Sequence, residues 1–128
     1  MTKILFIDGN RSFLETIAKY LSWYDYQVSA WEDSSSVLNH CLENTYDLCI
    51  FDAFCQPLNG YQLADFIKNH SNPKINQMRV LVIFEEEPPL ERFVFMKKHG
   101  IYAMTKYSSI ETWVEKISAI VQRSVLII

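Results

Sequence analysis

Three charged residues in this sequence each follow a short apolar run directly. Asp8 follows ILFI, Asp52 follows LCIF, and Lys106 follows YAMT. Two carboxylates and one ammonium are typical of a charged binding or reaction site. That chemistry needs the three side chains to lie together, so the segments that carry them decide whether a site exists.

Each of the three residues also has a simpler interpretation. Asp8 could cap a following helix, Asp52 could belong to a turn, and Lys106 could be an ordinary surface lysine. A hairpin at Asp8–Gly9 is excluded, because a hairpin needs a second strand after its turn and here a helical pattern follows. Taken singly, the simpler interpretation is favoured for each residue. Three such residues at the ends of alternate strands favour a shared site.

Strand-like and helix-like patterns alternate along the chain. Five short apolar runs are typical of strands that are buried on both faces. They are Lys3–Ile7, Gln27–Ala30, Leu48–Phe51, Val80–Phe84 and Tyr102–Thr105. Apolar residues at helical spacing follow each run. This order predicts an α/β fold, a (βα)5 chain forming a single domain over residues 1–128 around a doubly wound, five-stranded parallel sheet. In such a sheet, binding sites form at the carboxyl ends of the strands.

Local signals predict where several helices begin and end. Asp33 is expected to cap the second helix. Pro88–Pro89 indicates the start of the fourth helix, and Gly100 indicates its end. Ser108 and Glu111 have the spacing of a capping box at the start of the fifth helix.

Composition and charge exclude several classes of protein. The net charge of −3 and the scattered lysines and arginines argue against a nucleic-acid partner. No signal peptide or membrane span is recognisable, so we expect a cytoplasmic protein without a membrane partner. Cys41, Cys49 and Cys55 lack metal-ligand spacing and are predicted to be reduced core thiols.

No independent catalytic centre is predicted, so the chain is not expected to be an enzyme. His40, His70 and His99 have no convincing nucleophile as a neighbour. The first turn, DGNRS, lacks the glycine-rich loop of a flavin phosphate site. The apolar tail Val125–Ile128 leaves three interpretations open, which are a longer last helix, a partner or homodimer contact, and a continuation into a second domain.

Four stretches of the sequence carry a resemblance to a known family. They are ILFIDGN, YDLCIFDAFCQPLNGYQL, VLVIF and HGIYAMTKYSS. With them the chain resembles the response-regulator receiver domain of two-component signalling over nearly its whole length. The resemblance implies a flavodoxin-like fold with strand order 2-1-3-4-5. It implies that Asp52 accepts a phosphoryl group from a histidine kinase and that Lys106 contacts the phosphate. Mg²⁺ would be held by Asp8, Asp52 and the backbone carbonyl of Phe54.

Five positions depart from the family pattern. Gly9 replaces the second acid, which is the direct metal ligand, and Phe84 replaces the Ser/Thr whose hydroxyl holds a phosphoryl oxygen. Ala103 replaces the switch aromatic of the fifth strand, and Tyr107 replaces the proline after the lysine. Glu85 stands where the family prefers a small residue. A charge-assisted hydrogen bond is worth about 1.5–3 kcal/mol. We therefore expect a weak or absent Mg²⁺ site and much slower phosphoryl transfer.

Two hypotheses about function follow from the resemblance and the departures. In the first, the chain is an atypical receiver domain, a pseudo-receiver that acts as a protein-interaction module and has lost or weakened Mg²⁺-dependent phosphorylation. Its partner, a histidine kinase or a downstream regulator, would bind the face formed by the fourth helix, the fifth strand and the fifth helix. In the second, the chain is a slow but functional phospho-acceptor on Asp52, because Asp8 and Lys106 are retained.

Overall fold

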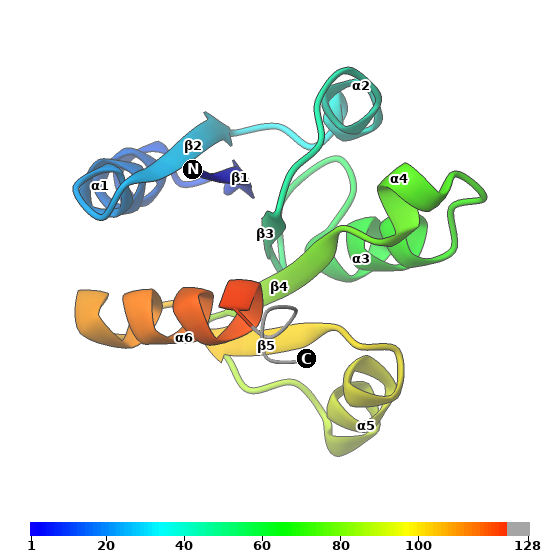
Figure 1. Ribbon diagram of the computed structural model, residues 1–128. Helices are drawn as coiled ribbons and strands as arrows, with labels where there is room; N and C mark the ends of the chain where they lie inside the picture. The colour runs from blue at the N-terminus through cyan, green and yellow to red at the C-terminus, as the bar shows by residue number, and fades with distance from the viewer. Residues whose placement is uncertain (123–128) are drawn as a thin grey trace.

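The computed structural model of this protein describes residues 1–122, and its sheet has the predicted form. The strands are β1 (Thr2–Ile7), β2 (Tyr26–Trp31), β3 (Leu48–Asp52), β4 (Arg79–Phe84) and β5 (Tyr102–Thr105). All neighbouring strands are parallel, and they lie in the order β2-β1-β3-β4-β5 (Figure 1). The predicted fold class and strand order are confirmed. The tail Val125–Ile128 lies outside the described residues.

Helices cover both faces of the sheet. Over residues 1–122 they are α1 (Arg11–Ser22), α2 (Val37–Glu43), α3 (Gly60–Lys68), α4 (Pro73–Asn76), α5 (Leu90–Lys98) and α6 (Ile110–Gln122). Figure 1 shows α1 and α6 on one side of the sheet, and α2, α3 and α5 on the other. The sequence pattern did not predict α4, which is a single turn, so the predicted fourth and fifth helices are α5 and α6. None of the helices in this part of the chain could span a membrane.

The strands are apolar throughout because side chains on both faces of the sheet are buried. Along β1, Ile4 and Phe6 enter the core beneath α1 and α6, whereas Leu5 and Ile7 enter the core beneath α2, α3 and α5. Trp113 of α6 is fully buried, and its ring centroid lies 5.9 Å from that of Phe6. The sheet that carries the candidate site is therefore anchored from both sides.

The start of α2 differs from the prediction. Asp33 does not cap it, because its Oδ1 accepts the backbone N–H of Ser35 at 2.6 Å and the helix begins only at Val37. The reason lies in a tertiary contact. Ser34 is buried, and its hydroxyl both donates to the carbonyl of Leu58 (2.9 Å) and accepts from the N–H of Leu58 (2.8 Å). The segment before α2 therefore holds the loop that follows β3.

The C-terminus of α5 and the N-terminus of α6 lie closer to the predictions. Gly100 follows α5 with a φ of 69°, as expected of a left-handed cap. At α6 the cap is one residue later than predicted, because the N–H of Thr112 donates to the hydroxyl of Ser109 at 3.2 Å. Ser108 donates its hydroxyl to the carbonyl of Thr105 instead, at 2.9 Å.

Candidate functional site

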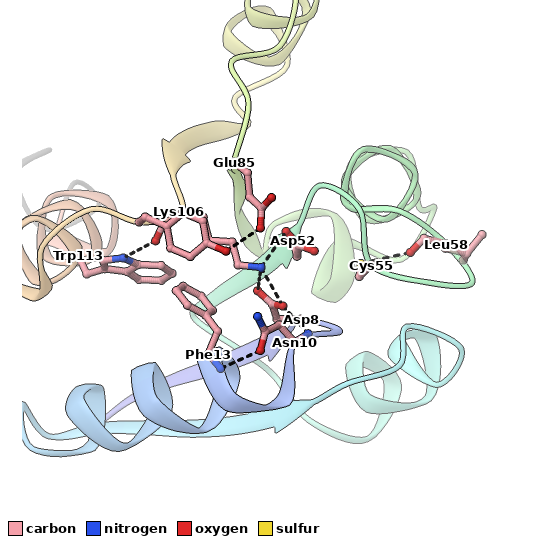
Figure 2. A network of polar contacts seen from close by, with 10 residues as sticks. Asp8, Asn10, Phe13, Asp52, Cys55, Leu58, Glu85, Lys106 and Trp113 are labelled. Atoms are coloured by element: carbon pink, nitrogen blue, oxygen red, sulfur yellow. Dashed lines mark hydrogen bonds and ion pairs between the residues drawn. The ribbon is translucent and has the colours of Figure 1, made fainter.

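The three charged residues lie together at the carboxyl edge of the sheet (Figure 2). Asp8 follows β1, Asp52 ends β3, and Lys106 follows β5. The three residues are buried, with exposed fractions of 0%, 7% and 3% respectively. The backbone N–H of Lys106 donates to the carbonyl of Phe84 at 2.8 Å, which fixes the lysine beside the end of β4. The structure thus assembles the site from residues that are far apart in the sequence.

The Lys106 ammonium is bound chiefly to Asp8. Its Nζ lies 3.1 Å from Oδ1 and 2.9 Å from Oδ2 of Asp8, and 3.6 Å from Oδ1 of Asp52 (Figure 2). The N–H of Asn10 donates to Oδ1 of Asp8 at 2.9 Å. Oδ2 of Asp8 has the ion pair with Lys106 but no hydrogen bond among the described residues. The lysine therefore compensates the charge of the fully buried Asp8.

Burial and neighbouring charges shift the pKa of two residues at the site. Burial raises the pKa of Asp52, the Asp8 carboxylate raises it further, and Lys106 offsets only part of the shift. Burial alone would lower the pKa of Lys106, but the hydrogen bond to Asp8 and the charges of both aspartates outweigh burial and raise it. Lys106 is therefore protonated at neutral pH. Because the pKa of Asp52 is raised in the folded state, its ionisation at neutral pH lowers the stability of the fold.

An Asp52→Asn variant is expected to be more stable than the native chain at neutral pH, with a higher Tm. The folded pKa of Asp52 lies above the unfolded value of 3.8, so the native chain loses stability as the pH rises through that interval. Well below pH 3.8 both states carry a protonated carboxyl, and the difference should vanish. Thermal unfolding of both proteins at neutral and acidic pH measures it. Equal Tm values at neutral pH would contradict the raised pKa.

Aromatic rings close one side of the site. The Lys106 ammonium lies 4.7 Å from the ring centroid of Phe13, within range of a cation–π attraction (Figure 2). The exposed Tyr107 packs edge-on against Phe13 at 5.6 Å and donates its hydroxyl to Oε1 of Glu85 at 2.7 Å. The indole N–H of Trp113 donates to the carbonyl of Lys106 at 3.2 Å. In the sequence, Phe13 and Trp113 are only apolar residues at helical spacing, and no pattern marks their contact with the site.

The three cysteines are buried and unpaired, as predicted. Cys55 lies nearest the site, and its Sγ donates to the carbonyl of Leu58 at 3.2 Å. Burial raises the pKa of Cys55 to about 12, and the carboxylates of Asp52 and Asp8 contribute to the shift. A thiol that stays protonated is a poor nucleophile. Cys55 therefore adds no covalent chemistry to the site.

Comparison with known protein families decides the identity of this chain. A family model described as the response regulator receiver domain matches residues 4–119. The chain belongs to this family. No curated protein matches it.

The receiver domain is also similar to solved structures. A two-component response regulator from Clostridium difficile gives a TM-score of 0.83 at 18% identity, with 97% of this chain and 98% of that chain covered. Chemotaxis protein CheY4 of Vibrio cholerae gives 0.82 at 20% identity, with 94% and 98% covered. NtrX from Brucella abortus gives 0.81 at 22% identity, with 98% of this chain but 28% of that chain covered. At these identities the likeness shows the fold alone.

The positions that depart from the receiver pattern have different surroundings. Gly9 is exposed, and a Cβ added to it would meet only the carbonyl oxygen of Glu32 at 4.0 Å. Phe84 is only 6% exposed, and its ring packs edge-on against Phe93 with a centroid distance of 5.7 Å. Ala103 is partly buried against the same core. Gly9 therefore leaves room for a carboxylate, whereas Phe84 belongs to the hydrophobic core.

The side chains present do not fit a Mg²⁺ site of the usual kind, although receiver domains generally bind Mg²⁺. Both oxygens of Asp8 lie within hydrogen-bond distance of the Lys106 ammonium, and Gly9 contributes no side-chain oxygen. Mg²⁺ demands a near-octahedral set of hard oxygen ligands, and a bound ammonium repels it. Within residues 1–122, no group of three or more His, Cys, Asp or Glu side chains could hold a metal ion. The Phe54 carbonyl as a ligand stays a prediction.

A close approach of two backbone segments explains the glycine at the start of α3. A Cβ added to Gly60 would lie 2.6 Å from the carbonyl oxygen of Asp52. A Gly60→Ala variant is expected to displace the end of β3 and to lose about 1–3 kcal/mol of stability. Gly9→Ala is the matched control and should change stability little, because the space around it is open. Urea denaturation measures both, and equal losses in the two variants would contradict the close approach.

Proposed function

We propose that this receiver domain is a pseudo-receiver, a signalling module that works by binding proteins while phosphorylation of Asp52 is weak or lost. It acts in the cytoplasm as a single domain over residues 1–128, on its own or as the N-terminal part of a longer response regulator. It performs no catalysis of its own. Its partners are a histidine kinase or a downstream regulator.

One observation carries the proposal, which is the burial of Phe84 at the end of β4. A phosphoryl group on Asp52 carries negative charge that needs donors at fixed positions. The side chain of Phe84 offers no hydrogen bond, and its edge-on contact with Phe93 places it in the core. A conformational response also needs an element with two states that the phosphate favours unequally. Phe84 provides no hydroxyl through which a phosphate could favour one of them.

The ion pair between Asp8 and Lys106 supports the same conclusion. Among the described residues, Lys106 is the cation that pairs with Asp52, but its two shorter contacts are to the oxygens of Asp8. The hydrogen bond between Tyr107 and Glu85 joins the segments that follow β5 and β4, and it keeps a carboxylate beside the site. An incoming phosphodonor therefore meets an additional negative charge, and its main cationic contact is already neutralised.

The partner surface that we propose is the face formed by α5, β5 and α6. A hollow of about 380 Å³ lies between α5 and β5. Its walls are mainly apolar and include Phe93, Met96, Ile101, Tyr102 and Ala103. Hollows of this kind accept the side chains that anchor a protein interface. The same surface would serve a second copy of the chain in a homodimer.

A second candidate function is a slow phospho-acceptor. Asp52 keeps an exposed fraction of 7% at the open edge of the sheet, and Lys106 lies 3.6 Å from it. Incubation with acetyl phosphate and Mg²⁺, followed by intact mass measurement, distinguishes the two functions. The pseudo-receiver should show little adduct within minutes. A stoichiometric adduct that disappears in the Asp52→Asn variant would replace our proposal with the second candidate.

A further inference from the structure

Helix α5 exposes apolar side chains on the surface that faces away from the sheet. Phe93 and Met96 point into the core beneath α3 and α5. Leu90, Val94 and Phe95, by contrast, are 76%, 59% and 39% exposed. An amphipathic helix normally places its apolar residues on one side only. A second apolar stripe on the outer side of α5 needs a separate explanation.

A hollow adjoins this stripe where α5 approaches α3. Its volume is about 430 Å³, and its lining consists of Asp65, Pro89, Glu91, Arg92 and Phe95. Helices α3 and α5 cover the same side of the sheet (Figure 1), so the hollow lies between neighbouring helices. We call the hollow, together with the exposed residues Leu90 and Val94 of α5, the α3–α5 surface.

The lining of the α3–α5 surface holds two carboxylates, Asp65 and Glu91, and one cation, Arg92. Asp65 and Glu91 form no ion pair among the described residues, and neither do Glu86 and Glu87 in the segment that leads into α5. The guanidinium of Arg92 lies over the ring of Tyr61, 4.3 Å from its centroid. Its position against α3 is thus fixed by an aromatic ring. The carboxylates remain free to bind a cationic partner.

We propose that the α3–α5 surface binds a basic amphipathic segment of a partner protein. Leucines or other large apolar side chains of that segment would cover Leu90, Val94 and Phe95. Its lysines or arginines would pair with Asp65 and Glu91. The unpaired carboxylates disfavour anionic lipid and nucleic acid, which would be repelled. The hollow of this surface faces α3, whereas the hollow of the α5–β5–α6 face lies against β5, and binding to the α3–α5 surface does not depend on the state of Asp52.

Fluorescence anisotropy with a labelled, designed amphipathic peptide of leucine and lysine tests the proposal. The native chain should bind this peptide and should bind a leucine–glutamate peptide of the same pattern much more weakly. The pair Asp65→Asn/Glu91→Gln should weaken binding by about threefold to tenfold. Phe95→Ala should weaken it by about tenfold through lost apolar contact. All three substituted side chains are surface-accessible, and circular dichroism confirms that each variant is folded.

Matched controls distinguish binding at this surface from nonspecific electrostatic attraction to the peptide. The pair Glu111→Gln/Glu115→Gln on α6 removes the same two charges, and Leu42→Ala on α2 removes an exposed apolar side chain. Both controls should bind like the native chain, and so should Asp52→Asn. No binding to the native chain, equal binding of the two peptides, or equal losses in the controls would overturn the proposal. A negative phosphorylation result bears only on the pseudo-receiver proposal.

Discussion

A Lys106→Met variant is expected to be less stable than the native chain by about 3–5 kcal/mol. Asp8 is fully buried, and both of its oxygens lie close to the Lys106 ammonium, at 3.1 and 2.9 Å. Methionine has a similar length but no charge. The variant would leave a buried carboxylate whose remaining donor among the described residues is the N–H of Asn10. Urea denaturation followed by circular dichroism measures the loss.

Removal of both charges separates the cost of an unpaired charge from the loss of packing. The double variant Asp8→Asn/Lys106→Met should recover most of the lost stability, because neither partner stays charged in the core. Lys116→Met on α6 is the matched control and should change stability by less than about 0.5 kcal/mol. A double variant that is as unstable as Lys106→Met would show that packing, and not charge, holds Lys106 in place.

The strands and the convergence of the charged residues could be predicted because both follow from local rules. Ile4 and Leu5 are buried on opposite faces of the sheet, so the first strand appears in the sequence as a continuous apolar run. Once five such runs alternate with helices, parallel pairing places the residue after each strand on one edge. Asp8, Asp52 and Lys106 therefore meet without any long-range information.

The contacts that close the site could not be predicted, because they depend on distances between loops. Tyr107 reaches Glu85 only because β4 and β5 are neighbours and end at the same level. The late start of α2 has the same kind of cause, since Ser34 bonds to Leu58, which is 24 positions away. The helix α4 was not predicted, because a single turn is too short to show a helical period in the sequence.

A Gly9→Asp/Phe84→Thr variant is expected to accept a phosphoryl group on Asp52 at least about a hundredfold faster than the native chain. Aspartate at position 9 finds open space and adds a carboxylate of the kind that a divalent cation requires. Threonine at position 84 adds a hydroxyl at the end of β4. One hydrogen bond to a charged group is worth about 1.5–3 kcal/mol, or roughly one to two powers of ten in rate. Intact mass against time with acetyl phosphate and Mg²⁺ measures the rate.

The two substitutions differ in their cost to the fold. Gly9 is exposed, so Gly9→Asp should leave stability nearly unchanged and raise the rate alone by about tenfold. Phe84→Thr removes a buried ring from its contact with Phe93 and should lose about 3 kcal/mol or more. The rates are therefore compared at a temperature at which circular dichroism shows that all variants are folded.

Addition of Asp52→Asn to the double variant measures the background rate of phosphorylation, because any remaining adduct arises elsewhere on the chain. The increase in the rate of transfer should depend on Mg²⁺. It should exceed the product of the increases in the two single variants if the cation and the hydroxyl act on the same phosphoryl group. A folded double variant that is no faster than the native chain would show that positions 9 and 84 do not limit transfer. The proposed loss of phosphorylation would then need a cause other than the missing acid and the missing hydroxyl.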